Sequence, residues 1–252
     1  MLTGNPTKTM FKTTYAKHTN FGLQKFRLDY NGSRNLSMNQ TTTFDFKVPR
    51  YGDLLMDTFF VVTLPHIWSP VVKINGSLRP YEFKWIKDIG TRMIEKVSFT
   101  VGGQIIQEFT GEYLYTLVER EFSEEKKQLY YKMTGNIPEL NDPKNSDLNI
   151  DNTNTRRYPN VIYTSKDEDD PDASIYSRKL YVPLNIWFTL AAKMAFPLIS
   201  LQYNELYISI EIKALQDLYV VRDVERAGDY AIYKKPVSTN ALYEFYRFLQ
   251  PP

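Results

Sequence analysis

Two histidines, a Gly-Gly-Gln tripeptide and an acidic run are the features of this sequence whose residue types could do chemistry. His18 and His66 are the only histidines. A cupin-type metalloenzyme needs a cluster of His and carboxylate ligands around one metal, and two distant histidines cannot supply it. His66 also lies between Pro65 and Ile67 at the predicted end of a strand. We therefore expect a structural role for His66 and no metal site.

The other two motifs have structural explanations. Gly102-Gly103-Gln104 matches a tripeptide of peptide-release factors, but it joins two alternating apolar runs, so a hairpin turn explains both glycines. Two-metal sites need carboxylates that converge from different elements. A contiguous acidic run in a polar loop more often stays solvated, and this one consists of Asp167, Glu168, Asp169, Asp170 and Asp172. A weak, incidental Ca²⁺ site is the alternative for that run.

Asparagine sequons are the last candidate sites, and they begin at Asn31, Asn35, Asn39 and Asn75. Glycosylation requires entry into a secretory lumen, and no apolar signal segment is visible at the N-terminus. We therefore interpret the sequons as ordinary polar loop residues. No Ser-His-Asp arrangement, P-loop or dinucleotide fingerprint is apparent. The sequence thus predicts no catalytic, cofactor-binding or metal-binding residue, and no cofactor.

Composition favours a large β-rich domain. The 252 residues include 19 Tyr and 15 Phe, which favour pleated, half-buried surfaces. Cysteine is absent, so a disulfide framework and thiolate metal sites are excluded. No run reaches the ~18 apolar residues of a membrane span.

Charge is close to balanced but unevenly distributed. The net charge of +2 argues against strong attraction to nucleic acid. Residues 1–50 carry eight basic and two acidic residues, and the remainder carries 23 basic and 27 acidic residues. We interpret the basic start as a solvated terminus, with an acidic partner or a lipid headgroup as the alternative.

The apolar periodicity predicts several strands. The strongest signal ends the aromatic block 180–212, where one face of a half-buried strand consists of Leu206, Ile208, Ile210 and Ile212. Residues 44–48 alternate in the same way, and Pro49 ends their pairing. Residues 97–101 and 104–109 form the predicted hairpin. The continuous apolar run 58–64 predicts a strand that is covered on both faces.

One helix is predicted, from Glu112 to Met133, with Leu114, Leu117, Val118, Phe122 and Leu129 near one face. Gly135 lies just past its end, as expected for a helix terminus. Residues 136–179 form a polar insertion of a length that is generally functional or disordered. A strand-dominated chain with one helix and long loops points to a β-sandwich or jelly roll.

Several long blocks, in register, resemble the major capsid proteins of nucleocytoplasmic large DNA viruses. These blocks are residues 2–21, 48–65, 85–119, 130–140 and 180–212. LYVVRDVERAGDY (218–230) and YEFYRFLQPP (243–252) are similar to the giant algal-virus and mimivirus-like branch. The resemblance covers nearly the whole chain except most of 141–179.

The resemblance implies a double jelly roll, in which two eight-stranded antiparallel barrels stand side by side and three copies form a pseudo-hexagonal capsomer. This chain looks like the N-terminal barrel alone, as a fragment, a split product or a truncated protein. The implied organisation is a basic N-terminal arm (1–43), an all-β barrel with one helix (44–214), and a connection (215–252) toward a second jelly roll that this chain lacks.

The resemblance also implies a role for each element. The family has no catalytic site, so the chain is expected to be a structural protein of an icosahedral virion, assembled in the host cytoplasm. Its partners would be copies of itself in a trimer, neighbouring capsomers and minor capsid proteins. The arm would lie at the capsomer base toward the minor capsid proteins and an inner membrane, without direct contact to nucleic acid. The insertion 136–179 would face outward or clasp a neighbouring subunit.

Two other functions remain open from the residues alone. A carbohydrate-binding jelly roll would expose aromatic side chains beside polar groups in one cleft, whereas Trp187, Phe188 and Phe196 lie within apolar runs, which favours the core. A cupin-like enzyme is disfavoured by the histidine count.

Overall fold

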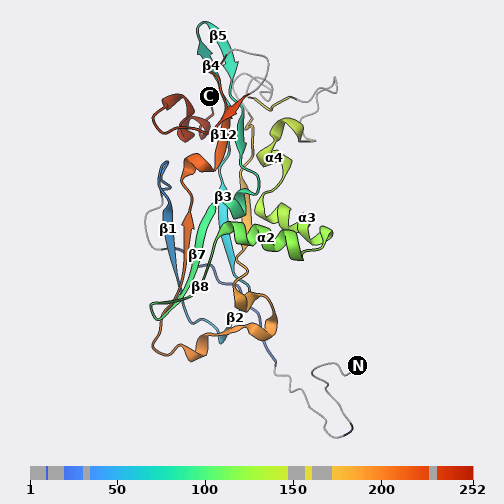
Figure 1. The fold of residues 1–252 in the computed structure, drawn as a ribbon, viewed down its shortest axis with the longest axis vertical. Coiled ribbons are helices and arrows are strands. Elements are labelled where there is room, and N and C mark those ends of the chain that lie inside the picture. The colour runs from blue at the N-terminus through green and yellow to red at the C-terminus, as the bar shows by residue number, and fades with distance from the viewer. Residues whose placement is uncertain are drawn as a thin grey trace.

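The computed structural model describes residue 10 and residues 20–30, 35–146, 157–160, 172–226 and 232–251. The turn predicted at Asn31-Gly32 lies outside these residues, as do much of the arm 1–43 and much of the insertion 136–179. Every strand pairing in the described residues is antiparallel. Figure 1 shows an elongated molecule in which α2, α3 and α4 line one long side of the strands.

The strands are short and fall into several small sheets. They are β1 (Thr42–Val48), β2 (Leu54–Leu55), β3 (Phe59–Leu64), β4 (Val71–Ile74), β5 (Ser77–Pro80), β6 (Phe83–Trp85), β7 (Ile94–Val101), β8 (Gln104–Phe109), β9 (Arg178–Pro183), β10 (Phe196–Pro197), β11 (Leu206–Ile212), β12 (Tyr219–Arg222) and β13 (Tyr233–Lys234). The largest sheet has the order β1-β11-β7-β8, and a three-stranded sheet has the order β13-β12-β6. The remaining pairs are β3 with β9, β4 with β5, and β2 with β10.

The largest sheet confirms the strongest sequence signal. The predicted inward side chains of β11 are at most 4% exposed, and they are Leu206, Ile208, Ile210 and Ile212. Ile210 lies opposite Phe44 of β1 and Val97 of β7. Because β11 is flanked on both sides, its apolar row has neighbours along its whole length and forms the middle of the core.

The Gly-Gly hairpin is also confirmed. Gly102 and Gly103 join β7 to β8 with φ angles of +57° and +83°. A two-residue turn of this kind needs positive φ at both positions, which glycine adopts without steric cost. Asn204 packs against the turn, because a Cβ added to Gly102 would lie 2.9 Å from its side-chain oxygen.

Strand β3 differs from its prediction. The apolar run 58–64 was expected to be covered on both faces, but the described residues cover only one. Leu64 is buried, whereas Phe59 and Val61 are each 42% exposed. The helices pack on the inner face of the β3–β9 pair, where a Cβ added to Gly90 of α1 would lie 3.0 Å from Val182. A continuous apolar run gives no information on which face has a neighbour, so periodicity could not resolve this.

The single predicted helix is wrong. The described α-helices are α1 (Ile89–Arg92), α2 (Gly111–Glu121), α3 (Glu124–Thr134) and α4 (Pro138–Asn141), with short 3₁₀ turns elsewhere. The predicted helix breaks at Phe122, whose ψ of 140° is extended, and Ser123 then begins α3 as a residue type that favours helix N-termini. The break rotates the second half, so that Tyr130 is buried and Leu129 is 64% exposed. The antiparallel β-rich character is confirmed, but the chain is not all-β.

The C-terminal segment, predicted as a connection, contributes buried side chains. Phe83 of β6 stacks on Tyr219 of β12 with ring centroids 4.9 Å apart. Tyr243 and Phe248, in 3₁₀ turns near the end of the described chain, are at most 1% exposed. These rings form the core at the end of the molecule where β4 and β5 project (Figure 1). Along the described chain, no helix has the length and hydropathy to span a membrane.

Candidate functional site

The described residues among those singled out for chemistry do not converge. His66 is exposed and accepts a hydrogen bond from the Ser177 N–H at 3.3 Å, beside Trp68 and Tyr176. His18 lies outside the described residues. Within the described ranges, no group of three or more His, Cys, Asp or Glu side chains could hold a metal ion.

The remaining motifs occupy turns and loops. Asn75, with a φ of +49°, forms the exposed turn between β4 and β5, and Asn35 and Asn39 lie in the segment before β1. Asn31 and the acidic positions 167–170 lie outside the described residues, so the predicted behaviour of that run stays a prediction. Asp172, its last member, is described and lies in a loop.

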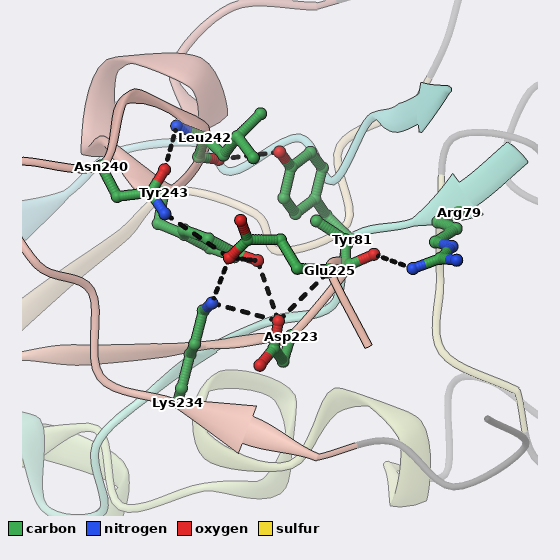
Figure 2. A network of polar contacts seen from close by, with 9 residues as sticks. Arg79, Tyr81, Asp223, Glu225, Lys234, Asn240, Leu242 and Tyr243 are labelled. Atoms are coloured by element: carbon green, nitrogen blue, oxygen red, sulfur yellow. Dashed lines mark hydrogen bonds and ion pairs between the residues drawn. The ribbon is translucent and has the colours of Figure 1, made fainter. Parts of the chain in front are cut away.

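A polar network that the sequence analysis missed joins the end of β12, β13 and the C-terminal turns (Figure 2). The Lys234 ammonium lies 3.0 Å from Asp223 Oδ1 and 2.8 Å from Glu225 Oε2. The Tyr243 hydroxyl donates to the same two oxygens, at 3.0 and 3.2 Å. Lys234 also lies over the Tyr243 ring, with Nζ 3.8 Å from the centroid. These four side chains are called the C-terminal network below.

The charges of the C-terminal network stabilise one another. Burial alone would lower the pKa of Lys234, but hydrogen bonds with Glu225, Tyr243 and Asp223 raise it above its ordinary value. Burial would raise the pKa of Asp223, yet hydrogen bonds from Lys234 and Tyr243 lower it. Burial raises the pKa of Tyr243 to about 12. At neutral pH the network therefore holds an ammonium, two carboxylates and a neutral phenol, and this arrangement contains no group poised to exchange a proton.

Backbone contacts around the C-terminal network attach it to neighbouring segments. Tyr81 donates its hydroxyl to the Leu242 carbonyl at 2.7 Å, and Arg79 donates to the Val224 carbonyl at 2.6 Å. The Asn240 side chain accepts from the Leu242 N–H at 3.0 Å (Figure 2). The network therefore joins the C-terminal turns to β5, β12 and β13, which is a structural role.

A second polar network fastens residues 157–160 to β6. The buried Tyr158 hydroxyl donates to the Phe83 carbonyl at 2.7 Å and accepts from the Phe83 N–H at 3.0 Å. It also lies 2.8 Å from the Ser69 hydroxyl. The Asn160 side-chain amide donates to the carbonyls of Ser69 and Tyr81 at 2.7 and 2.9 Å. Burial raises the pKa of Tyr158, so this hydroxyl stays protonated and its role is to satisfy backbone groups.

The outer faces of the largest sheet and of the β3–β9 pair differ in polarity. The outer face of β1-β11-β7-β8 carries a polar row, in which Lys96 lies 3.6 Å from Glu108 and 3.4 Å from Glu211. The outer face of β3–β9 is apolar at one end, where Val61 lies opposite Tyr181 and both are 42% exposed, and polar at the next pair, Thr63 and Lys179. The first face suits water, and the second suits contact with another surface.

The end of the molecule around β2 is located in Figure 1, and large apolar side chains near it are exposed. They include Leu54, Leu190, Ile199 and Tyr203, which are 59%, 59%, 67% and 95% exposed. The aromatic residues proposed for the core lie beside this end. Phe188 is buried, as predicted, and Trp187 and Phe196 are partly buried against it. They form no exposed aromatic cleft of the kind that a sugar-binding site needs.

Comparison with known proteins gives a consistent family. A family model described as "Major capsid protein N-terminus" matches residues 9–249. The chain is 29% identical to the major capsid protein of Phaeocystis pouchetii virus, over 98% of this chain and 46% of that protein. It is 30% identical to capsid protein 1 of Acanthamoeba polyphaga mimivirus, over 97% of this chain and 37% of that protein. The chain thus spans less than half the length of these relatives.

Two solved structures share the fold. PBCV-1 VP54, a crystal structure fitted into a reconstruction of the virophage Sputnik, matches with a TM-score of 0.53 and 20% identity, over 82% of this chain and 38% of that one. A quasi-atomic model of the PBCV-1 virus capsid matches with a TM-score of 0.52 and 20% identity, over 89% of this chain and 41% of that one.

Proposed function

The chain belongs to the major capsid protein family, whose N-terminal domain matches residues 9–249, and on that premise we propose that it is a structural subunit of the icosahedral shell of a large DNA virus. The observation that carries the proposal is the length of the match, whose range of residues 9–249 includes the four-stranded sheet, the helices and the C-terminal network. The proposal assigns the chain to the virion, with assembly in the host cytoplasm, and gives it no catalytic activity or cofactor.

The structural mechanism is geometric. We propose that the antiparallel sheets form the first eight-stranded jelly roll of a double jelly roll, with an arm over 1–43, a barrel over 44–214 and a connection over 215–252. Three copies would form a pseudo-hexagonal capsomer, because many modest interfaces sum in a closed shell. The exposed apolar side chains of Phe59, Val61 and Tyr181 on the outer face of β3–β9 support this proposal, since exposed apolar patches mark contact sites.

The proposed partners follow from charge and position. The basic arm would contact minor capsid proteins and an inner membrane, since eight of the first 50 residues are basic and two are acidic. Direct contact with nucleic acid is not part of the proposal. The insertion 136–179 would face outward or clasp a neighbouring subunit.

The test is cryo-electron microscopy of particles purified from the host that carries this gene, with mass spectrometry to identify this chain in them. We expect density for this barrel, including the β7–β8 hairpin and α2–α3, in a pseudo-hexagonal lattice. Absence of the chain from the particles would refute the proposal. A glycan-array screen of the purified chain covers the alternative, because saturable sugar binding by a protein that forms no lattice would favour a carbohydrate-binding module.

A further inference from the structure

Asp88 is a buried acid with no obvious structural partner. Its side chain is 3% exposed, and its Oδ1 atom has no hydrogen-bond partner. It lies directly before α1 with a φ of +53°, a left-handed conformation that non-glycine residues rarely adopt. Its carboxyl group makes no capping hydrogen bond to α1.

The surroundings of Asp88 cannot easily relax. A Cβ added to Gly90 of α1 would lie 2.4 Å from the backbone oxygen of Thr134 in α3, so the two helices touch through backbone atoms. The Tyr130 hydroxyl of α3 is also buried and also lacks a hydrogen-bond partner. Two unpartnered polar groups therefore lie in the tight layer of α1 and α3, an arrangement that is costly in the folded state.

The charged and titratable groups around Asp88 do not neutralise it. Arg92 of α1 is exposed, and its guanidinium lies over the Tyr115 ring of α2 at 5.2 Å. Glu119 of α2 adds a second negative charge, although Lys127 of α3 pairs with it at 3.1 Å.

Two tyrosines of α3 complete these surroundings. Tyr131 donates its hydroxyl to Glu119, and the Asp88 charge raises the pKa of both Tyr130 and Tyr131 further, in addition to the effect of their burial. An ionised Asp88 therefore faces one exposed cation, Arg92, and one opposing anion, Glu119, while the two tyrosines stay neutral.

We propose that Asp88 is an acid-stabilised latch, in which protonation of its carboxyl group tightens the packing of α1 against α3 and ionisation loosens it. The inference concerns the folded domain and is independent of assembly into a shell. It would make the helix layer, which packs on the inner face of β3–β9, more stable in a mildly acidic compartment than at neutral pH.

The sign of the effect follows from proton linkage. Burial raises the pKa of Asp88 from 3.8 to about 6, against a smaller opposing effect of Arg92. The unfolded chain therefore loses this proton at lower pH than the folded chain. Stability falls as pH rises from about 4 to about 6, and the loss is complete above that range. Between pH 4.5 and pH 7 this corresponds to a roughly twentyfold change in the unfolding constant.

Asp88→Asn tests the latch, because asparagine keeps the shape, tolerates positive φ and never ionises. Asp57→Asn, at an exposed position, is the matched control. We would measure amide hydrogen exchange of Gly135 and Asn136, whose N–H groups both bond to the Tyr131 carbonyl at the end of α3. Comparison of variants at one pH cancels the intrinsic pH dependence of exchange.

At pH 7 we expect these two amides to exchange roughly a hundredfold more slowly in Asp88→Asn than in the native chain. At pH 4.5 the difference should shrink to roughly sixfold, and Asp57→Asn should match the native chain at both values. An unchanged rate at pH 7, or equal slowing at both pH values, would overturn the proposal. Equal slowing in β11 would also overturn it, because a latch acts on the helix layer. A carboxyl NMR titration gives an independent check, since Asp88 titrating below pH 4.5 contradicts the latch.

Discussion

Ile210→Ala is the substitution whose cost the structure determines most directly. Ile210 is 2% exposed in the middle of β11, between Phe44 and Val97 on the flanking strands. The change removes three carbon groups, each worth about 0.8 kcal/mol of transfer free energy. The remaining cavity adds to this, because two flanking strands in register cannot both move inward. We expect a loss of about 3–4 kcal/mol in the free energy of unfolding, within the ~2–5 kcal/mol typical of such truncations.

The matched control is Ile105→Ala in β8 of the same sheet, where the isoleucine is 61% exposed. Both changes lose the β-propensity of isoleucine, a term within about 1 kcal/mol, so their difference isolates burial. Urea unfolding, followed by circular dichroism, measures both, and an unchanged m-value would show that the same surface unfolds. Costs for Ile210 and Ile105 that agree within about 0.5 kcal/mol would refute the assigned register, because a one-residue slip exchanges the two faces of a strand.

Three further substitutions test the other packing arguments by the same unfolding assay. Gly111→Ala places a methyl group 2.1 Å from a backbone oxygen of α1 and should lower the free energy of unfolding by more than about 3 kcal/mol. Its control is Gly52→Ala, which has open space around it and should cost under about 1 kcal/mol. Equal costs would contradict the close approach of α1 and α2. Tyr158→Phe leaves buried backbone groups of β6 unsatisfied and should cost about 2–4 kcal/mol, and a neutral result would contradict the second network. Lys234→Met should cost about 1–3 kcal/mol because it leaves two carboxylates facing each other. Its control is Lys235→Met, at a side chain that is 58% exposed, which should cost under about 1 kcal/mol. The reverse order of costs would contradict the C-terminal network.

The sequence predicted elements whose signal is local and repeated. The alternation that ends at Ile212 spans a whole strand, and burial on one side follows from period two alone. The Gly102-Gly103 turn was predictable for a similar reason, because positive φ at two adjacent positions leaves few alternatives to glycine.

Features that depend on a single residue or on distant partners were missed. The helix break at Phe122 was invisible because the apolar spacing continues across it, and only Ser123 signals a new N-terminus. The C-terminal network joins Asp223 to Tyr243, twenty positions away, and no sequence period connects them. The one local feature of this network in the sequence is Lys234, two residues before Pro236. A Lys near a proline is common in any polar segment, so it does not indicate a network. Tertiary partners, rather than propensity, place these side chains.

The two polar networks and the apolar sheet face support one physical picture of how this domain works. Tyr158 and the C-terminal network use their donors and acceptors to fasten distant segments, so buried polar groups that could otherwise do chemistry hold the chain in one shape. The outer face of β3–β9, which the described residues leave exposed, then has a fixed geometry, since its inner side is held by α1 and α3. A fixed apolar face loses little side-chain or backbone entropy on contact. A subunit that must repeat the same contact many times over a shell needs that property, and a flexible binding loop would not supply it.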